Sequence, residues 1–348
     1  MDEVTHAINI DAADEHFHPR SDHPHWNESA WFGVVLPERR TTIYVYFFHR
    51  PNMNLSSGGV KVWDPSGSSE YDCLGYDYNR HLALPPGADM FDFTLDNGLS
   101  VTMLEPFGRF RITHRGAFDL DLEWRKLTDP YAFGQNRGLD GWTTESEGFT
   151  SGHYQQYGQM TGTVTVGGET ITVDHPAIRD RSWGPRDAVA ARRMELMWCC
   201  ASERNYFSVL SVSQHQPTQD PVLGVDDAVA FGYYCRDGVS GLVTGGTCRV
   251  SERGSDLRPQ RAELHATDDR GRVLEATGTN LNTLVWPVYD RTYQLCAGMQ
   301  WTFDGVTAGG EDWSCMPTEQ ARAVLRGTPP AQRSLSDFSR NVSTSIRS

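Results

Sequence analysis

The chain has 348 residues and a formal net charge of −14, and its Lys and Arg residues are scattered rather than clustered. This acidic balance argues against a nucleic acid or an anionic membrane surface as partner. No segment approaches the ~20 apolar residues of a membrane-spanning helix, and the acidic N-terminus does not resemble a signal peptide, so a cytoplasmic protein is expected. The seven cysteines show no C-x-x-C spacing and are expected to be reduced thiols.

Apolar and polar residues alternate along much of the first half, and this alternation predicts β-strands. The clearest example is residues 117–126 (AFDLDLEWRK), in which apolar and acidic side chains point to opposite faces. Residues 160–174 predict a hairpin with Gly167-Gly168 as its two-residue turn. In chain order, the other strands of this half are expected at 41–49, 58–64, 90–96, 99–105 and 108–114.

The same alternation resumes in the second half of the chain. Only residues 318–327 predict a helix, which Gly327 ends. The fold class expected is therefore all-β, with two tandem barrels or sandwiches and one short C-terminal helix. Further strands are expected at 194–201, 205–213, 229–236, 241–250, 259–267, 272–278 and 292–303. The domain boundaries expected are 1–187, 188–330 and, for a mobile tail, 331–348.

The stretch RDRSWGPRD, residues 179–187, lies between the two predicted domains. Its Gly-Pro pair interrupts regular structure, so a bend is expected here. Trp183 is expected to be buried at this bend, because Trp side chains are mostly buried. The residues expected to form the structural motif around it are Arg181, Gly184, Arg186 and Asp187.

Residues 153–187 resemble the central signature of proteins related to hydroxyneurosporene synthase, the carotenoid 1,2-hydratases. That signature has an Asp, then His or Arg, any residue, an aromatic residue and a small one. Asp180, Arg181, Trp183 and Gly184 occupy those places. Ser182 stands where many members have Glu or Gln, and the resulting Asp-x-Ser-Trp-Gly form resembles a bacterial branch of the family. The resemblance implies two consecutive lipocalin-like β domains, a fold that hosts both hydratases and pericyclases.

Asp180 is the first candidate for catalysis. A carboxyl that is partly buried beside Trp183 would have a raised pKa and could donate a proton. Alkene hydration, or the reverse dehydration, needs such an acid and also aromatic faces that stabilise a carbocation. The alternative is that Arg181 or Arg186 pairs with Asp180 and lowers its pKa. The flanking arginines favour this alternative.

Four further residues could supply acid–base groups. His153 and His175 precede Asp180, Glu28 lies at the start of the first strand, and Glu311 lies in the segment GGEDWSC before the helix. Each also has a structural interpretation, as a satisfied histidine, a surface carboxylate or part of an exposed turn. The aromatic residues expected to bind the substrate are Trp31, Tyr157, Trp183, Trp198, Tyr233 and Trp286.

Metal and nucleotide cofactors are not expected. Residues 15–25 hold four histidines, but no cysteine partner or H-E-x-x-H frame accompanies them, and two prolines indicate an irregular arm. No dinucleotide fingerprint, P-loop or G-x-S-x-G elbow is present in the sequence. Chemistry at the site would therefore be carried by the side chains themselves.

Together with these patterns, the resemblance implies a cofactor-independent lyase or isomerase, of hydratase or dehydratase type, acting on an apolar terpenoid-, steroid- or polyketide-like molecule. Two alternatives stay open: a pericyclase that folds a polyene, and a non-catalytic carrier of hydrophobic metabolites. A carrier pocket would contain apolar groups only, whereas a lyase needs a carboxyl or histidine directed inward. The site is expected in a barrel or at the domain junction near residues 153–187. The sequence leaves open whether the protein is a monomer or a homodimer.

Overall fold

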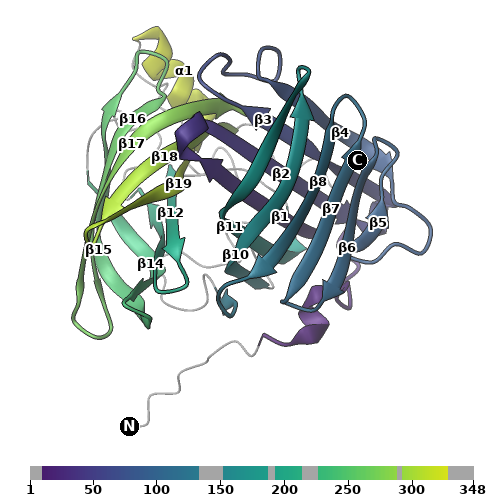
Figure 1. Ribbon diagram of the computed structural model, residues 1–348, viewed down its shortest axis with the longest axis horizontal. Coiled ribbons are helices and arrows are strands. Elements are labelled where there is room, and N and C mark those ends of the chain that lie inside the picture. Colours follow the sequence, from purple (N-terminus) through teal and green to yellow (C-terminus); the bar gives the residue numbers. More distant parts are fainter. Residues whose placement is uncertain (1–9, 133–151, 187–192, 214–225, 288–291, 328–348) are drawn as a thin grey trace, which may run out of the picture.

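The computed structural model describes residues 10–132, 152–186, 193–213, 226–287 and 292–327, which form two β units side by side (Figure 1). The first is an eleven-stranded antiparallel sheet with the order β4-β3-β2-β1-β11-β10-β8-β7-β6-β5, in which β9 also pairs with β10. The second is a closed barrel of eight strands in chain order, β12 to β19. The prediction of an all-β chain with two lipocalin-like units and one short helix is confirmed.

The first sheet curls around its own apolar core, which includes Phe32, Phe110 and Trp124. Its strands are β1 (Trp26–Leu36), β2 (Thr41–Arg50), β3 (Leu55–Trp63), β4 (Gly75–Ala83), β5 (Asp92–Thr94), β6 (Leu99–Glu105), β7 (Arg109–Arg115), β8 (Asp119–Lys126), β9 (Tyr131–Ala132), β10 (Gly152–Val166) and β11 (Glu169–Pro185). Three short 3-10 helices accompany them: η1 (Ala12–Glu15), η2 (Pro37–Arg39) and η3 (Pro51–Met53). The predicted Gly167-Gly168 hairpin turn is confirmed.

The barrel has its own core, which includes Phe207 and Trp301. Its strands are β12 (Met194–Ser202), β13 (Asn205–Val212), β14 (Asp227–Arg236), β15 (Val239–Arg253), β16 (Pro259–Asp268), β17 (Val273–Val285), β18 (Thr292–Phe303) and β19 (Val306–Pro317). Helix α1 (Thr318–Arg326) follows, and Gly327 ends it with a φ of 61°. Among the described residues, every strand of the sheet precedes Arg186 and every strand of the barrel follows Arg193. The domain boundary at 187 and the tail at 331–348 lie outside the described residues and stay predictions.

The expected bend at residues 179–187 is wrong. Strand β11 continues to Pro185, with Trp26 opposite Pro185 on β1 and Gly152 opposite Trp183 on β10. Two flanking strands supply the ladder hydrogen bonds here, so tertiary pairing overrides the local Gly-Pro signal. Trp183 is half-buried rather than fully buried. Asp187 lies outside the described residues.

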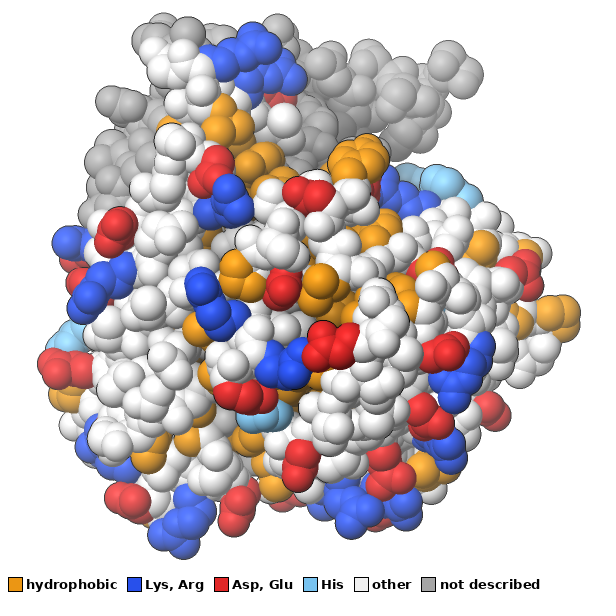
Figure 2. All heavy atoms as spheres, turned by 45° about the horizontal axis from the view of Figure 1, so that its top comes forward, with side chains coloured by type: hydrophobic (Ala, Val, Ile, Leu, Met, Phe, Trp, Pro, Cys, Tyr) orange, Lys and Arg blue, Asp and Glu red, His pale blue; other side chains and the backbone are white. Residues whose placement is uncertain are grey.

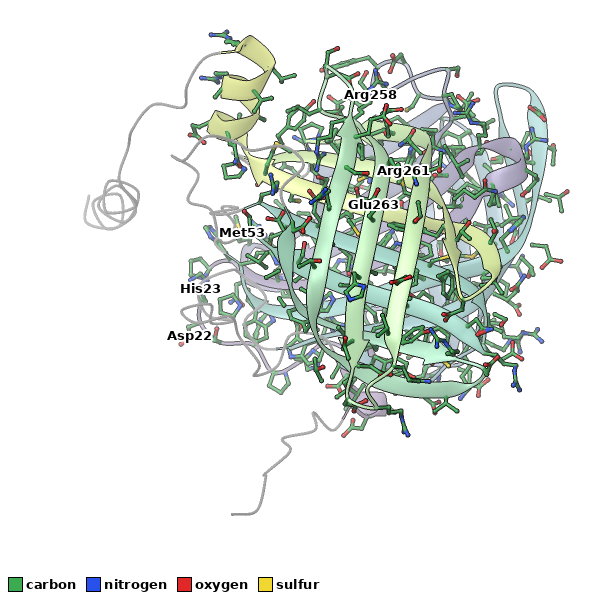
Figure 3. All side chains as sticks on the ribbon, turned by 90° about the vertical axis from the view of Figure 1, so that its left-hand side faces the viewer. Asp22, His23, Met53, Arg258, Arg261 and Glu263 are labelled. Atoms are coloured by element: carbon green, nitrogen blue, oxygen red, sulfur yellow. The ribbon has the colours of Figure 1, made fainter. Side chains whose placement is uncertain are left out.

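The surface carries charges of both signs. Figure 2 shows acidic and basic side chains interspersed on the face that it draws. On the outer wall of the barrel, Arg261 and Glu263 of β16 form an exposed pair 3.5 Å apart (Figure 3). All seven cysteines are free thiols, as predicted. Within the described ranges, no helix is long and apolar enough to cross a membrane.

Candidate active site

A third buried cluster joins the two units, apart from the core inside each. Among its members, Trp31, Tyr44 and Trp63 come from the sheet, and Trp198 and Tyr233 come from the barrel. We call this cluster and the polar side chains on the same faces the junction. Five of the six aromatic residues that were predicted to bind substrate belong to it: Trp31, Tyr157, Trp198, Tyr233 and Trp286.

Strand register places the junction side chains in a row across the sheet. Trp31 on β1 is opposite Tyr46 on β2 and Asp180 on β11, and Asp180 is opposite Gln155 on β10. Opposite residues of antiparallel strands point to the same face, and successive residues point to alternate faces. Asp180 therefore shares the junction face with these aromatic rings, whereas its neighbours Arg179 and Arg181 point to the other face.

Asp180 is a half-buried acid in the centre of this row. Burial raises its pKa to about 7, although the charge of Arg186 and a hydrogen bond from the backbone of Trp31 act in the opposite direction. The flanking arginines do lower this pKa, but burial outweighs them, so the expectation of a net lowering is wrong. Arg181 pairs instead with Glu28, because strand alternation directs its side chain away from Asp180. At neutral pH, Asp180 can accept or donate a proton.

Glu311 reaches the junction from the barrel side. It lies on β19, opposite Trp198 on β12, and the indole Nε1 of Trp198 donates a hydrogen bond of 3.0 Å to its Oε2. Its Oε1 has no hydrogen-bond partner among the described residues. Burial raises the pKa of Glu311 to about 8, against the effects of Trp198 and Lys61. Glu311 is therefore mainly protonated at neutral pH. Its segment forms a buried strand, so the alternative interpretation as an exposed turn is wrong.

Lys61 is a junction residue that the sequence analysis missed. It is fully buried on β3, and its Nζ lies 3.0 Å from the ring centroid of Trp286 and 4.5 Å from that of Tyr78. Burial lowers its pKa well below the ordinary value. The contacts with the aromatic rings stabilise the ammonium form of Lys61 by about 2 kcal/mol. Burial of that ammonium without a counter-ion, however, costs several kcal/mol. Desolvation therefore dominates, and the neutral amine is favoured.

A sequence signal for Lys61 existed. In GGVKVWD, Val60 and Val62 pack into the core of the sheet, so Lys61 and Trp63 point the other way. An alternating strand normally exposes its polar face to solvent. A Trp on that face indicates that it is covered, and the lysine beside it is then covered as well.

Hydrogen bonds connect the sheet to the barrel across the junction. The hydroxyl of Tyr157 donates to the carbonyl of Phe207 at 2.5 Å. The Oε1 of Gln155 accepts from Ser208 Oγ at 2.7 Å and from the hydroxyl of Tyr233 at 3.3 Å. The Nε2 of Gln155 has no partner among the described residues. Buried polar atoms are normally satisfied, so open donors and acceptors at one place indicate a ligand or water there.

His153 lies on the same face, opposite Ser182 on β11. Burial, and then the charge of Arg186, lowers its pKa to about 3. The imidazole is therefore neutral at physiological pH. It can orient a group by hydrogen bonding, but it is a weak base.

Glu28 and His175 do not reach the junction. Glu28 points to the opposite face, where it accepts hydrogen bonds of 3.0 Å from Trp26 Nε1 and from the backbone of His18. Burial raises its pKa, but the hydrogen bond from His18 and the charge of Arg181 outweigh this effect and lower it. His175 is bound to Glu38, with 3.1 Å between Nε2 and Oε1.

The N-terminal arm lies over that opposite face rather than in the junction. His18 stacks on Trp183, with 3.9 Å between ring centroids and an interplanar angle of 12°. His16 pairs with Asp89. Asp22 and His23 of the arm lie near Met53 of η3 (Figure 3). Across the part of the chain that the structure describes, no group of three or more side chains could hold a metal ion.

Comparisons with known proteins place the chain in a family. Solved structures with a similar chain path include kievitone hydratase from Nectria haematococca, at 11% identity and a TM-score of 0.46, with 91% of this chain and 95% of that chain covered. CghA with Sch210972 is 12% identical with a TM-score of 0.45, and the match covers 84% of this chain and 87% of that chain. An AttH candidate from Nitrosomonas europaea is 14% identical with a TM-score of 0.45, and the match covers 84% of this chain and 91% of that chain. No curated protein matches the sequence. The model of DUF7064, a domain of unknown function, matches residues 11–313, and the chain belongs to that family.

Proposed function

We propose that the junction is the active site of a cofactor-independent enzyme that transfers protons to and from an apolar small molecule. The reaction class that we propose is that of a hydro-lyase, a hydratase or dehydratase, with an isomerase as its close variant. The observation that carries this proposal is that two acids with raised pKa values, the half-buried Asp180 of the sheet and the fully buried Glu311 of the barrel, lie within electrostatic reach of the same ring, Tyr44. Terpenoid-, steroid- and polyketide-like molecules have the apolar bodies that such a cluster would bind.

The two acids suit different roles. Glu311 is mainly protonated near neutral pH and would deliver a proton to a carbon–carbon double bond. Asp180 titrates near neutrality and, in its ionised form, would take the proton of the attacking water. Burial raises the pKa of Tyr44 most strongly, and the charges of Glu311 and Asp180 raise it further. Both carboxyls therefore lie near this one ring. The reverse sequence of proton transfers would remove water.

The aromatic rings around Tyr44 would stabilise positive charge that develops on carbon. Tyr44 stacks on Trp31 at 4.9 Å between centroids and meets Trp286 edge to face at 5.8 Å. Ring faces attract cations, and more strongly where water is excluded. A carrier would need apolar contacts only, so the two carboxyls and the amine of Lys61 favour an enzyme over a carrier.

The rate should depend on pH in a bell-shaped manner. Asp180 must be ionised to act as the base, so kcat/KM should rise as pH increases through about 7. Glu311 must be protonated to act as the acid, so kcat/KM should fall as pH increases through about 8. The measurement is kcat/KM for the identified substrate in buffers of constant ionic strength. A flat profile across both limbs would contradict these roles.

The proposed function is tested with the small molecule that co-purifies with the full-length protein. The molecule is identified by mass spectrometry and is then incubated with the protein in water enriched in oxygen-18. A hydratase should incorporate the heavy oxygen into the product. Asp180→Asn and Glu311→Gln should still bind the molecule and should lose about 10²–10⁴ in rate. Full turnover by both variants would place the chemistry elsewhere.

A further inference from the structure

The chain has 31 basic residues, and only two of them, Lys61 and Lys126, are lysines. Lys126 lies at the end of β8 with a half-exposed side chain, 3.6 Å from Asp129. Lys61 is fully buried in the junction, and its Nζ has no hydrogen-bond partner among the described residues. A chain that uses arginine almost everywhere therefore places one of its two lysines at the centre of the proposed site.

Where this chain buries a cation for structural reasons, it uses arginine beside a carboxylate. Arg179 pairs with Glu15 and Arg181 pairs with Glu28, and all four side chains are fully buried. Lys61 has no ion pair of this kind within the described ranges. Guanidinium groups stay protonated in proteins, whereas a buried amine can lose its proton and become a nucleophile. The choice of lysine here thus points to chemistry rather than to charge.

The surroundings of Nζ suit a reaction with an apolar substrate. Besides Trp286 and Tyr78, the ring of Tyr44 lies 5.0 Å from Nζ, so aromatic surface surrounds the amine. Glu311 is close enough for the two groups to shift each other's pKa. A mainly protonated acid therefore lies within electrostatic reach of an amine whose pKa burial lowers.

We propose that Lys61 is a nucleophile that binds the substrate covalently through a carbonyl group. The substrate class is then an α,β-unsaturated or β-hydroxy aldehyde or ketone with an apolar body. This inference rests on the proposed function, for which it names the substrate class.

The chemistry needs no oxidant or reductant. The lone pair of Lys61 Nζ adds to the carbonyl carbon, and the oxygen takes a proton from Glu311. Loss of one water gives a protonated imine, which withdraws electrons from the conjugated double bond. Water then adds to the β-carbon and gives its proton to Asp180, which passes that proton to the α-carbon of the resulting enamine. A second water hydrolyses the protonated imine, returns a proton to Glu311 and frees the amine, so the net reaction is the addition of one water.

The experiment traps the imine on the wild-type, full-length protein. The probe is trans-cinnamaldehyde with sodium cyanoborohydride, which reduces an imine to a stable secondary amine, and peptide mass spectrometry locates the adduct. At pH 7 an ordinary lysine is almost fully protonated, so Lys61 should react at least about tenfold faster than Lys126. Raising the pH to about 10 should accelerate Lys126 strongly and Lys61 little. An adduct on Lys126 without one on Lys61 would overturn the inference.

Variants separate this inference from the proposed function. Lys61→Arg keeps a cation among the rings but cannot form an imine, so turnover should be lost, whereas Lys126→Arg should behave as wild type. Trapping at Lys61 should persist in Asp180→Asn. If Lys61 is not trapped but incorporation of heavy oxygen still depends on Glu311, the covalent step is wrong and the proposed function stands. If Lys61 is trapped while Asp180→Asn and Glu311→Gln keep full turnover, the proposed function is wrong.

Discussion

Glu311→Gln should make the protein more stable and nearly inactive. Turnover should fall by about 10²–10⁴, the usual contribution of a general acid. The folded-state pKa of Glu311 is raised from 4.5 to about 8, so folding must carry an unfavourable buried charge once the carboxyl ionises. The neutral glutamine has no such cost and keeps an oxygen that can accept the hydrogen bond from Trp198.

The stability gain of Glu311→Gln should depend on pH in a defined way. It should be absent below about 4.5, grow as pH rises, and level off above about 8, at up to about 5 kcal/mol. Urea denaturation of both proteins at several pH values measures it. The matched control is Glu263→Gln on the exposed wall of the barrel (Figure 3), which should match wild type in turnover. Loss of stability in Glu311→Gln at pH 8 would show that Glu311 is a structural carboxylate.

Glu15→Ala should cost about 3–5 kcal/mol of unfolding free energy, because it leaves a buried guanidinium without its counter-charge. Arg179 is fully buried, with its guanidinium 4.5 Å from the ring centroid of Phe110 and 5.1 Å from that of Trp124. Gln156 accepts a hydrogen bond of 2.9 Å from its Nε but carries no charge. The guanidinium of Arg179 stays protonated, so it cannot avoid the cost of an unpaired buried charge by losing its proton.

Chemical denaturation measures the effect of Glu15→Ala, and Glu263→Ala serves as the control because its exposed ion pair contributes little. Glu15→Gln should fall between the two, since it keeps some hydrogen bonding without the charge. A loss below about 1 kcal/mol in Glu15→Ala would show that Gln156 and the surrounding rings are sufficient for Arg179. The prediction also tests the position of η1, which brings Glu15 to Arg179 from the N-terminal arm.

Much of the fold could be predicted because alternation of apolar and polar residues is a local property. Residues 117–126 alternate clearly, and β8 forms at Asp119–Lys126. Strand β4 was not predicted, because its face in the junction carries Tyr76 and Tyr78 and its pattern does not alternate cleanly. In strand β19, the segment GGEDWSC also allowed an exposed turn, since Gly-Gly and acidic residues are unusual in a buried strand.

The candidate site could be predicted in part. Adjacency in sequence suggested that Arg181 would control Asp180, but strand alternation separates their side chains. The Gly-Pro pair at 184–185 hides the strand at 179–185, and with it the alternation that separates the two side chains. Glu311 and Lys61 are more than 200 residues apart in the chain, and they come near each other only because the barrel packs on the sheet. No local pattern contains that information.

The two acids of the junction should titrate near neutrality, and carbon-13 NMR of carboxyl-labelled Asp and Glu can follow this titration without a substrate. One Glu signal should titrate near 8 and should be absent in Glu311→Gln. One Asp signal should titrate near 7 and should be absent in Asp180→Asn. If the signals lost in these two variants instead titrate below about 5, as ordinary carboxyls do, both acids are ionised at neutral pH and the proposed acid–base site is wrong.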